Sequence, residues 1–332
     1  TGTINTMSGG QQTVKSGGAG TIGTMSSGMQ EISSGGTGTV VTMTSGEQNI
    51  YSDGTGTVST MNDGGQYITS GTGTISTMSG GYQDISSGTG TVSTMSGGEQ
   101  NIYSGGTGTI STMNGGLQLV ENGGSGIVST LSGGTQMIVD QGSGTIGTMS
   151  GGSQMISSGG TGTVDIMSGG MQDISSGGTG TVNTMSGGGQ RISSGIGTVS
   201  TMSGGVQLIE SGAAGTISAM NGGVQYVQNG GTALDTVIAG GTQLVSSGAV
   251  VSGATLSAGI QQVYDGTNLN NITFAGGTQA VMSGATVSGM QVANGVQSIA
   301  SGGSAADTVV SAGGSLQLNS GGTVSSLTLT SG

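Results

Sequence analysis

Cysteine, histidine, proline and tryptophan are all missing from the 332 residues of this chain, and phenylalanine occurs once. Without cysteine the chain has no disulfides and no thiolate ligands for a metal. Without histidine and cysteine it also lacks the commonest general base and the most reactive nucleophile of enzymes. We therefore expect no catalytic residues, no cofactor and no metal site, and we interpret the chain as a protein that is not an enzyme.

Charge is scarce and almost all of one sign, with 2 basic against 14 acidic residues and a net charge of -12. Nucleic-acid binding needs clustered Lys and Arg, so we expect no nucleic-acid partner. The acidic residues are scattered, and corners such as residues 35–39 carry Thr where calcium-binding β-helix turns carry Asp. A calcium ladder is therefore not expected either.

Long apolar runs are absent as well, and none approaches the roughly 20 residues of a membrane-spanning helix. No charged-then-apolar signal segment opens the sequence. The sequence begins at Thr1 in mid-repeat and ends at Ser331 and Gly332. We expect a processed or excised segment of a longer protein.

A repeat marked by one glutamine runs along the whole chain. Each marker stands two residues before Ile or Val, at steps of 17 or 18 residues until a last step of 20. Units this small cannot bury a core alone and must stack on their neighbours. The markers are Gln12, Gln30, Gln48, Gln66, Gln83, Gln100, Gln118, Gln136, Gln154, Gln172, Gln190, Gln207, Gln225, Gln243, Gln261, Gln279 and Gln297, with Gln317 as a looser last member.

Each unit holds two short β-type runs separated by Gly-rich corners, and the 78 glycines argue against helix. The pattern predicts an all-β fold, a right-handed parallel β-helix of about eighteen short coils. Alternation in the second run places Gln30 and Ile32 inside, so the glutamines should form a stacked amide ladder. A bulge between Ile22 and Met25 would bring both of these side chains into the core.

The repeat changes its composition at residue 232. Residues 1–231 form regular coils with a Thr-Gly-Thr-Ile/Val-x-Thr-Met run, whereas residues 232–332 are richer in Ala and keep the Gln-x-Ile/Val marker. We expect diverged coils of the same β-helix and not a second fold. Residues 268–271 predict a looser corner.

The later coils resemble the repeats of AIDA-type, self-associating autotransporter passengers. The strings that carry the resemblance are residues 240–248 and 276–287, which contain Gly-Gly-Thr-Gln-x-Val-x-Ser-Gly, and residues 302–310, which read Gly-Gly-Ser-Ala-Ala-Asp-Thr-Val-Val. The resemblance implies a passenger β-helix at the bacterial cell surface or secreted, exported with an outer-membrane barrel. It also implies adhesion: autoaggregation with copies on neighbouring cells, biofilm formation, or attachment to a host surface receptor during virulence.

The same resemblance implies O-glycosylation of repeat serines by a dedicated glycosyltransferase. The Ser-Ser-Gly corners provide the acceptors, and alternation makes the first serine of each pair the outward one. The alternative is that these serines only close turns. The candidate acceptors are Ser33, Ser86, Ser157, Ser175, Ser193 and Ser246.

The outward positions of the second run carry an unusual set of tyrosines. We interpret Tyr51, Tyr67, Tyr82 and Tyr103 as a candidate adhesive strip. The alternative is that Tyr simply suits an exposed β surface.

Two other functions remain open from the sequence. Recurring Thr-x-Thr triplets such as Thr37-Gly38-Thr39 are typical of ice-binding β-helices, although we expect them beside a Gly corner, where a flat surface is least assured. A purely structural β-solenoid without a specific ligand is the other.

Overall fold

The computed structural model describes residues 1–330, whose regular elements are all β-strands. The predicted fold class is confirmed: the chain is an all-β parallel solenoid of about 18 turns. The described residues contain no helix long and apolar enough to cross a membrane. The chain divides into two compact units, Thr1–Asp165 and Ile166–Gly332, which are taken in turn.

The first unit is built from coils that each contribute a longer first strand and a four-residue second strand, merged in the first two coils. Its strands are β1 (Gly2–Val14), β2 (Ala19–Ile32), β3 (Thr37–Met43), β4 (Glu47–Ile50), β5 (Gly54–Met61), β6 (Gly65–Ile68), β7 (Gly71–Met78), β8 (Tyr82–Ile85), β9 (Gly88–Met95), β10 (Glu99–Ile102), β11 (Gly106–Met113), β12 (Leu117–Val120), β13 (Ser125–Leu131), β14 (Thr135–Ile138), β15 (Ser143–Met149) and β16 (Ser153–Ile156). Strand β17 (Thr161–Met167) contains the boundary.

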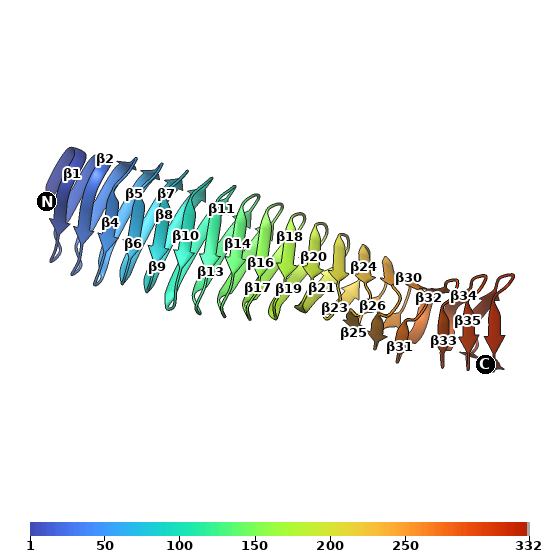
Figure 1. The fold of residues 1–332 in the computed structure, drawn as a ribbon. Coiled ribbons are helices and arrows are strands. Elements are labelled where there is room, and N and C mark those ends of the chain that lie inside the picture. Colours follow the sequence, from blue (N-terminus) through green and yellow to red (C-terminus); the bar gives the residue numbers. More distant parts are fainter. Residues whose placement is uncertain (331–332) are drawn as a thin grey trace. The chain divides into compact units, whose positions relative to one another are not determined.

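Equivalent strands of successive coils pair in parallel, so like residues stand above like residues. In the first strands Thr55 pairs with Thr72, and in the second strands Gln66 pairs with Gln83. Figure 1 shows these coils following one another in sequence order, from blue to green. Each outward or inward position of the repeat therefore becomes a continuous column.

The core of this unit consists of three apolar columns. Ile22 and Met25 are both fully buried on the first strand, which confirms the predicted irregularity between them, and Ile32 is buried on the second. Ile or Val holds the first and third columns in every coil from Ile22 to Ile156. Met holds the second column, with Leu131 replacing it once, because a flexible thioether side chain fills a narrow interior well.

The predicted glutamine ladder is also confirmed. From Gln30 to Gln154, each side-chain Nε2 donates to Oε1 of the glutamine in the preceding coil at 2.6 or 2.7 Å. Nε2 of Gln48 also lies 3.4 Å from the carbonyl oxygen of Gly38 across the core. These fully buried amides thus satisfy their hydrogen-bonding groups without solvent.

The Thr-Gly-Thr triplets open the first strands directly after the Gly corners, beside which the sequence places them. Gly38 is an inward residue of β3, and a Cβ there would lie 2.6 Å from Oε1 of Gln30 in the preceding coil. Glycine is needed because the long glutamine side chain crosses the core and fills the space that a Cβ would occupy. The threonines on either side consequently face outward from a regular strand.

The second unit repeats this arrangement up to residue 227 and then shortens its first strands. Its strands are β18 (Met171–Ile174), β19 (Gly178–Met185), β20 (Gly189–Ile192), β21 (Gly195–Met202), β22 (Val206–Ile209), β23 (Ala214–Met220), β24 (Val224–Val227), β25 (Thr232–Leu234), β26 (Val237–Ile238), β27 (Thr242–Val245), β28 (Val250–Ser252), β29 (Thr255–Leu256), β30 (Ile260–Val263), β31 (Asn268–Asn270), β32 (Thr273–Val281), β33 (Thr286–Ser288), β34 (Gln291–Ile299), β35 (Ser304–Ala306), β36 (Val309–Val310), β37 (Gly314–Leu318), β38 (Thr323–Ser325) and β39 (Thr328–Leu329).

The glutamine ladder of this unit joins Gln172 to Gln297 with Nε2–Oε1 distances of 2.6 to 3.0 Å. The prediction that Gln317 continues it is wrong. Leu316 pairs with Gln297, and Gln317 is exposed. The alternation in β37 places Leu316 and Leu318 in register with the Gln and Ile positions, so an apolar residue ends the ladder.

The ladder of first strands is interrupted once in this unit. Strand β31 pairs with β28, whereas β33, β35 and β38 form a separate three-stranded sheet. The interruption lies at residues 268–271, where the sequence predicts a looser corner.

Candidate functional site

The outer face of the second strand carries the candidate adhesive strip. Gln and Ile point inward in each second strand, so the residue before the Gln, the residue after it and the residue after the Ile lie on the solvent side. We call these positions together the second-strand face. The four predicted tyrosines all lie on it, but at different positions of the repeat.

Tyr67 and Tyr82 are brought together. Their ring centroids are 5.3 Å apart at an interplanar angle of 69°, and their phenol groups are hydrogen-bonded to each other. The Tyr82 ring also covers Gly65, where a Cβ would lie 2.7 Å from the ring carbon Cζ. The edge-to-face geometry and the covered glycine hold this pair in one orientation.

The Tyr67 phenol remains protonated over the physiological range. Burial raises the pKa of this phenol well above its ordinary value, and the hydrogen bond with Tyr82 and the charges of Tyr82, Glu47 and Asp84 raise it further. Tyr67 therefore offers a neutral hydroxyl group beside two aromatic rings.

Tyr51 and Tyr103 do not join this pair. Both follow the inward Ile of their coils, and the two coils between them carry Thr69 and Ser86 at that position. Tyr51 is 37% exposed, whereas Tyr103 is half-buried. The four tyrosines thus form a pair with two separate flanking rings and not a continuous row.

Acidic groups surround the tyrosines. The Asp84 carboxylate accepts a hydrogen bond from Nδ2 of Asn101 at 2.8 Å. Burial raises the pKa of Asp84, the Asn101 bond lowers it, and the charge of Glu99 raises it again. A groove of about 560 Å³ beside Tyr82 is lined by Glu47 and Asp63. This part of the second-strand face is therefore aromatic and negatively charged.

An apolar column follows the tyrosines along the same face, and sequence reasoning missed it. Leu119 pairs with Met137, and Met137 pairs with Met155, so three outward apolar side chains stand in register. Leu117 and Val139 flank them and are half-buried, and Met155 is 41% exposed. The signal was present in the sequence, since each of the three immediately follows a marking glutamine.

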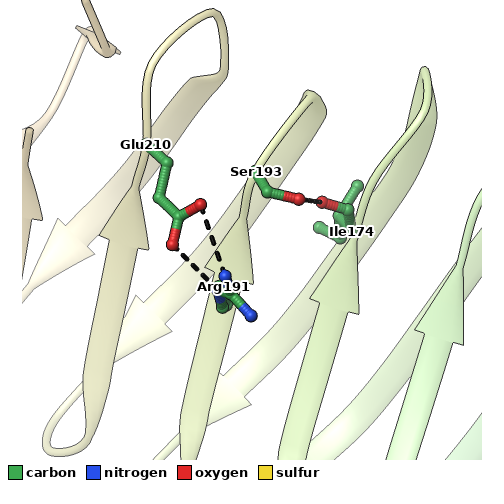
Figure 2. Close-up of polar contacts among 4 residues, drawn as sticks. All are labelled: Ile174, Arg191, Ser193 and Glu210. Carbon is green, nitrogen blue, oxygen red and sulfur yellow. Dashed lines mark hydrogen bonds and ion pairs between the residues drawn. The ribbon is translucent and has the colours of Figure 1, made fainter. Parts of the chain in front are cut away.

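In the second unit the same face carries an ion pair between adjacent coils. Nε of Arg191 lies 2.8 Å from Oε1 of Glu210, as Figure 2 shows. Asp173 is the register partner of Arg191. Burial raises the pKa of Asp173, while the positive charge of Arg191 lowers it. An ion pair this exposed contributes little to stability.

The six candidate glycosylation serines close the corners with their main chains. The amide of Ser157 donates to the carbonyl of Ile138 in the preceding coil, and its own carbonyl accepts the amide of Gly160. Ser86 is exposed and the other five are half-buried. At Ser193 the hydroxyl donates to the carbonyl of Ile174 at 3.2 Å (Figure 2).

In five of the six pairs the second serine is exposed and the first is half-buried, and at Ser86 and Ser87 both are exposed. Ser34, Ser158 and Ser176 adopt left-handed φ values of 54°, 50° and 46° at the tip of their corners. All six second serines are exposed. Strand alternation ends at the first serine, so it does not determine which hydroxyl extends furthest into solvent.

Among the described residues, no three acidic side chains gather closely enough to hold a metal ion. The Glu47 and Asp63 carboxylates lie on an open groove surface beside Tyr82.

Comparison with known proteins gives one informative result. No protein-family model and no curated protein matches this chain. Among solved structures it is similar to the crystal structure of a TibC-catalyzed hyper-glycosylated TibA fragment, with 25% identity over 98% of both chains and a TM-score of 0.35. At this TM-score the match carries no argument, so the resemblance to AIDA-type autotransporter passengers rests on the sequence strings given above.

Proposed function

We propose that this chain is a non-enzymatic adhesin of the bacterial cell surface, an autotransporter-type passenger whose second-strand face binds other surfaces. The observation that supports it most is this face itself in the first unit, where the Tyr67–Tyr82 pair and the Leu119, Met137 and Met155 column expose aromatic and apolar side chains. Monomers rarely expose such contiguous apolar surface without a partner.

Self-association with copies on neighbouring cells is the form of adhesion that we favour, leading to autoaggregation and biofilm formation. The apolar column of Leu119, Met137 and Met155 contains no charged side chain, so apolar contacts between two copies can form within the column itself. Attachment to a host receptor would use the same face.

The test substitutes the tyrosines and the apolar column of the second-strand face in separate variants. Purified wild-type protein should self-associate in analytical ultracentrifugation, and the triple variant Leu119→Ser, Met137→Ser, Met155→Ser should do so at least tenfold more weakly. The variant Tyr51→Ser, Tyr82→Ser, Tyr103→Ser should reduce association less. The matched control, Thr89→Ser, Thr107→Ser, Thr161→Ser on the first strands, should leave it unchanged.

If both face variants associate like the wild type and keep its melting temperature, the second-strand face does not mediate self-association. Cells displaying the variants should settle from suspension more slowly than cells displaying the wild type.

We further propose that the corner serines accept sugars from a glycosyltransferase during maturation. The second serines of these corners are exposed, and Ser34, Ser158 and Ser176 among them adopt left-handed φ values. Intact mass measurement of protein from its native host should show additions in multiples of one sugar unit. Ser→Ala at the first and at the second serine of one corner would tell which hydroxyl is used.

Ice binding is a second candidate, because the threonine triplets lie in regular strands. Thr55 and Thr57 stand in register with Thr72 and Thr74, and these stand in register with Thr89 and Thr91. Strand geometry sets such columns about 6.6 Å apart along the strand and about 4.8 Å apart between coils. A thermal hysteresis assay decides: arrested ice growth that is lost in Thr72→Val, Thr74→Val supports ice binding, and an adhesin should show none.

A further inference from the structure

A second feature of the molecule lies on the first strands of the second unit, at the interruption between β31 and β33. Elsewhere in the second unit, the amide that opens a first strand donates to the preceding coil: Asn268 to Ala249 at 2.9 Å, and Ser304 to Ala285 at 2.9 Å. Within residues 1–330, no such bond joins Thr286 to Thr267. The backbone hydrogen bonds between successive first strands are therefore interrupted between β31 and β33.

The far end of the same strands is open too. At adjacent steps a corner amide donates to the following coil, from Gly253 to the Asn270 carbonyl and from Gly289 to the Ala306 carbonyl, both at 3.0 Å. Among residues 1–330, the Asn271 amide makes no corresponding hydrogen bond to the Ser288 carbonyl. Two facing strand edges thus keep unpaired donors and acceptors, which proteins normally satisfy with a partner.

The cause of the opening lies in the core. Leu269 pairs with Val251 below it, and Phe274 pairs with Leu256 below and Val292 above, so this coil carries the larger residue at each step. The inward residues of three successive coils are Ala249, Val251, Ala254 and Leu256, then Thr267, Leu269, Ile272 and Phe274, then Ala285, Val287, Met290 and Val292. Coils stacked about 4.8 Å apart leave no room for the extra volume.

Thr267 also places a polar hydroxyl group in this crowded core. It occupies a position that is Ala in the coils before and after it, and its buried Oγ1 is without a hydrogen-bond partner among the described residues. A buried hydroxyl without a partner costs free energy that a hydrogen-bonding occupant of the site would recover.

The opening forms a cleft of about 500 Å³. It is lined by residues 269–274 on one coil and by residues 288–291 with Ala293 on the next. The lining contains amides and hydroxyls, such as Asn270, Asn271 and Gln291, and apolar side chains, such as Leu269 and Met290, but no ionisable side chain. Its volume lies in the range of pockets that hold small ligands.

We propose that this cleft binds a short, uncharged, extended peptide as an added strand between the two coils. The main chain of the peptide pairs with the open edges of β31 and β33, as in β-augmentation. Its apolar side chains contact Leu269 and Met290, and its polar groups meet Asn270, Asn271 and Gln291. A charged peptide is disfavoured because no lining group neutralises it.

Hydrogen exchange tests the cleft without any ligand. In the free protein, the amides of Thr286 and Ser288 should exchange at least tenfold faster than those of Asn268 and Ser304. Equal protection of all four amides would show that the ladder is closed and would overturn the proposal.

The peptide test uses acetyl-TGTVST-amide, which copies residues 55–60 and already stacks as a strand in this fold. Added peptide should slow exchange at Thr286 and Ser288 at least tenfold and give saturable binding by calorimetry. The proline-containing acetyl-TPTVST-amide lacks one strand amide and should bind at least tenfold more weakly. Absence of binding, or equal binding of both peptides, would contradict strand addition.

A variant with smaller inward side chains in this coil should close the cleft. Thr267→Ala with Phe274→Leu gives this coil the residues of the preceding one at those two positions. We expect Thr286 and Ser288 to become protected and the peptide affinity to fall at least tenfold. The matched control Thr242→Ala, two coils away on the outer surface, should change neither, whereas undiminished binding to the double variant would contradict the assigned site.

Discussion

At the residue scale, inward glycine and inward glutamine of facing strands act as one packing unit. In the first unit, a Cβ on Gly108 would lie 2.7 Å from Oε1 of Gln100 and in contact with the Ile102 side chain. Since Gln100 is held by bonds to Gln83 and from Gln118, it cannot withdraw. The glutamine ladder therefore requires a glycine at position 108. The Gln100 side chain can reach across the core only because this position has no Cβ.

This reciprocity predicts that Gly108→Ala destabilises the protein by about 2 kcal/mol, through overpacking and a broken buried amide bond. Gly9→Ala is the matched control, because a Cβ on this strand glycine meets nothing within 4 Å. Urea unfolding should show a change within about 0.5 kcal/mol for the control. A similar loss of unfolding free energy in both variants would mean that strand propensity, and not the contact with glutamine, causes the destabilisation.

The half-buried carboxyl of Asp84 predicts a pH dependence of stability. Burial raises its pKa in the folded state, so between the unfolded value near 4 and the raised value the folded protein binds more protons. Stability conferred by the protonated form is therefore lost as the pH rises through that window. Asp84→Asn should raise the free energy of unfolding at pH 7 by about 0.5 kcal/mol, a figure reduced for solvent screening.

Urea unfolding from pH 3 to pH 8 measures this effect. Asn101→Ala removes the hydrogen bond that lowers the pKa of Asp84 and should steepen the loss of stability with pH. A steeper profile in Asp84→Asn than in the wild type would contradict the assignment.

At the element scale, corners absorb changes in coil length while strands do not. Thr55 and Thr72 are 17 residues apart and still pair in register, because the corner before Thr72 has lost one residue. An extra glycine inserted before Gly71 should therefore leave the melting temperature within a few degrees of the wild type. One residue inserted between Gln83 and Asp84 would turn Ile85 outward and should prevent cooperative unfolding in a thermal scan.

Much of this architecture could be predicted from the sequence, because a strict period translates directly into columns. The inward positions of Ile32 and Gln30 follow from alternation alone. The strand position of Gly38 could not be read, since glycine marks corners as often as it marks close packing. The Tyr67–Tyr82 contact depends on side-chain direction across coils, and the cleft at Leu269 depends on comparing core volumes between neighbouring coils. Neither quantity is visible in a repeat alignment.

The change of repeat at residue 232 belongs to the same scale. First strand β25 has 3 residues, where β23 has 7. Beyond it the inward position of Gly215 is taken by Ala233 and then by Val251. We propose that residues 1–231 and 232–332 are regular and diverged coils of one repeat, in which larger first-strand side chains take the place of the inward glycine.

At the scale of the whole molecule, the net charge of -12 opposes the self-association that we propose. Only Lys15 and Arg191 are basic, and Arg191 is engaged by Glu210. Two copies that meet through the second-strand face bring Glu47, Asp84 and Glu99 near like charges. The Debye length, over which such charges repel one another, falls from about 30 Å at 0.01 M salt to about 3 Å at 1 M.

Self-association should accordingly strengthen at least tenfold between 0.01 and 1 M sodium chloride, as measured by sedimentation equilibrium, since salt removes repulsion and leaves the apolar contacts. The variant Glu47→Gln, Asp84→Asn, Glu99→Gln should associate at low salt nearly as well as the wild type does at high salt, with a much smaller salt dependence. Association that weakens with salt would instead require contacts between opposite charges. In a chain with two basic residues, such contacts would have to come from Lys15 or Arg191, and substitution of each by Gln would identify which.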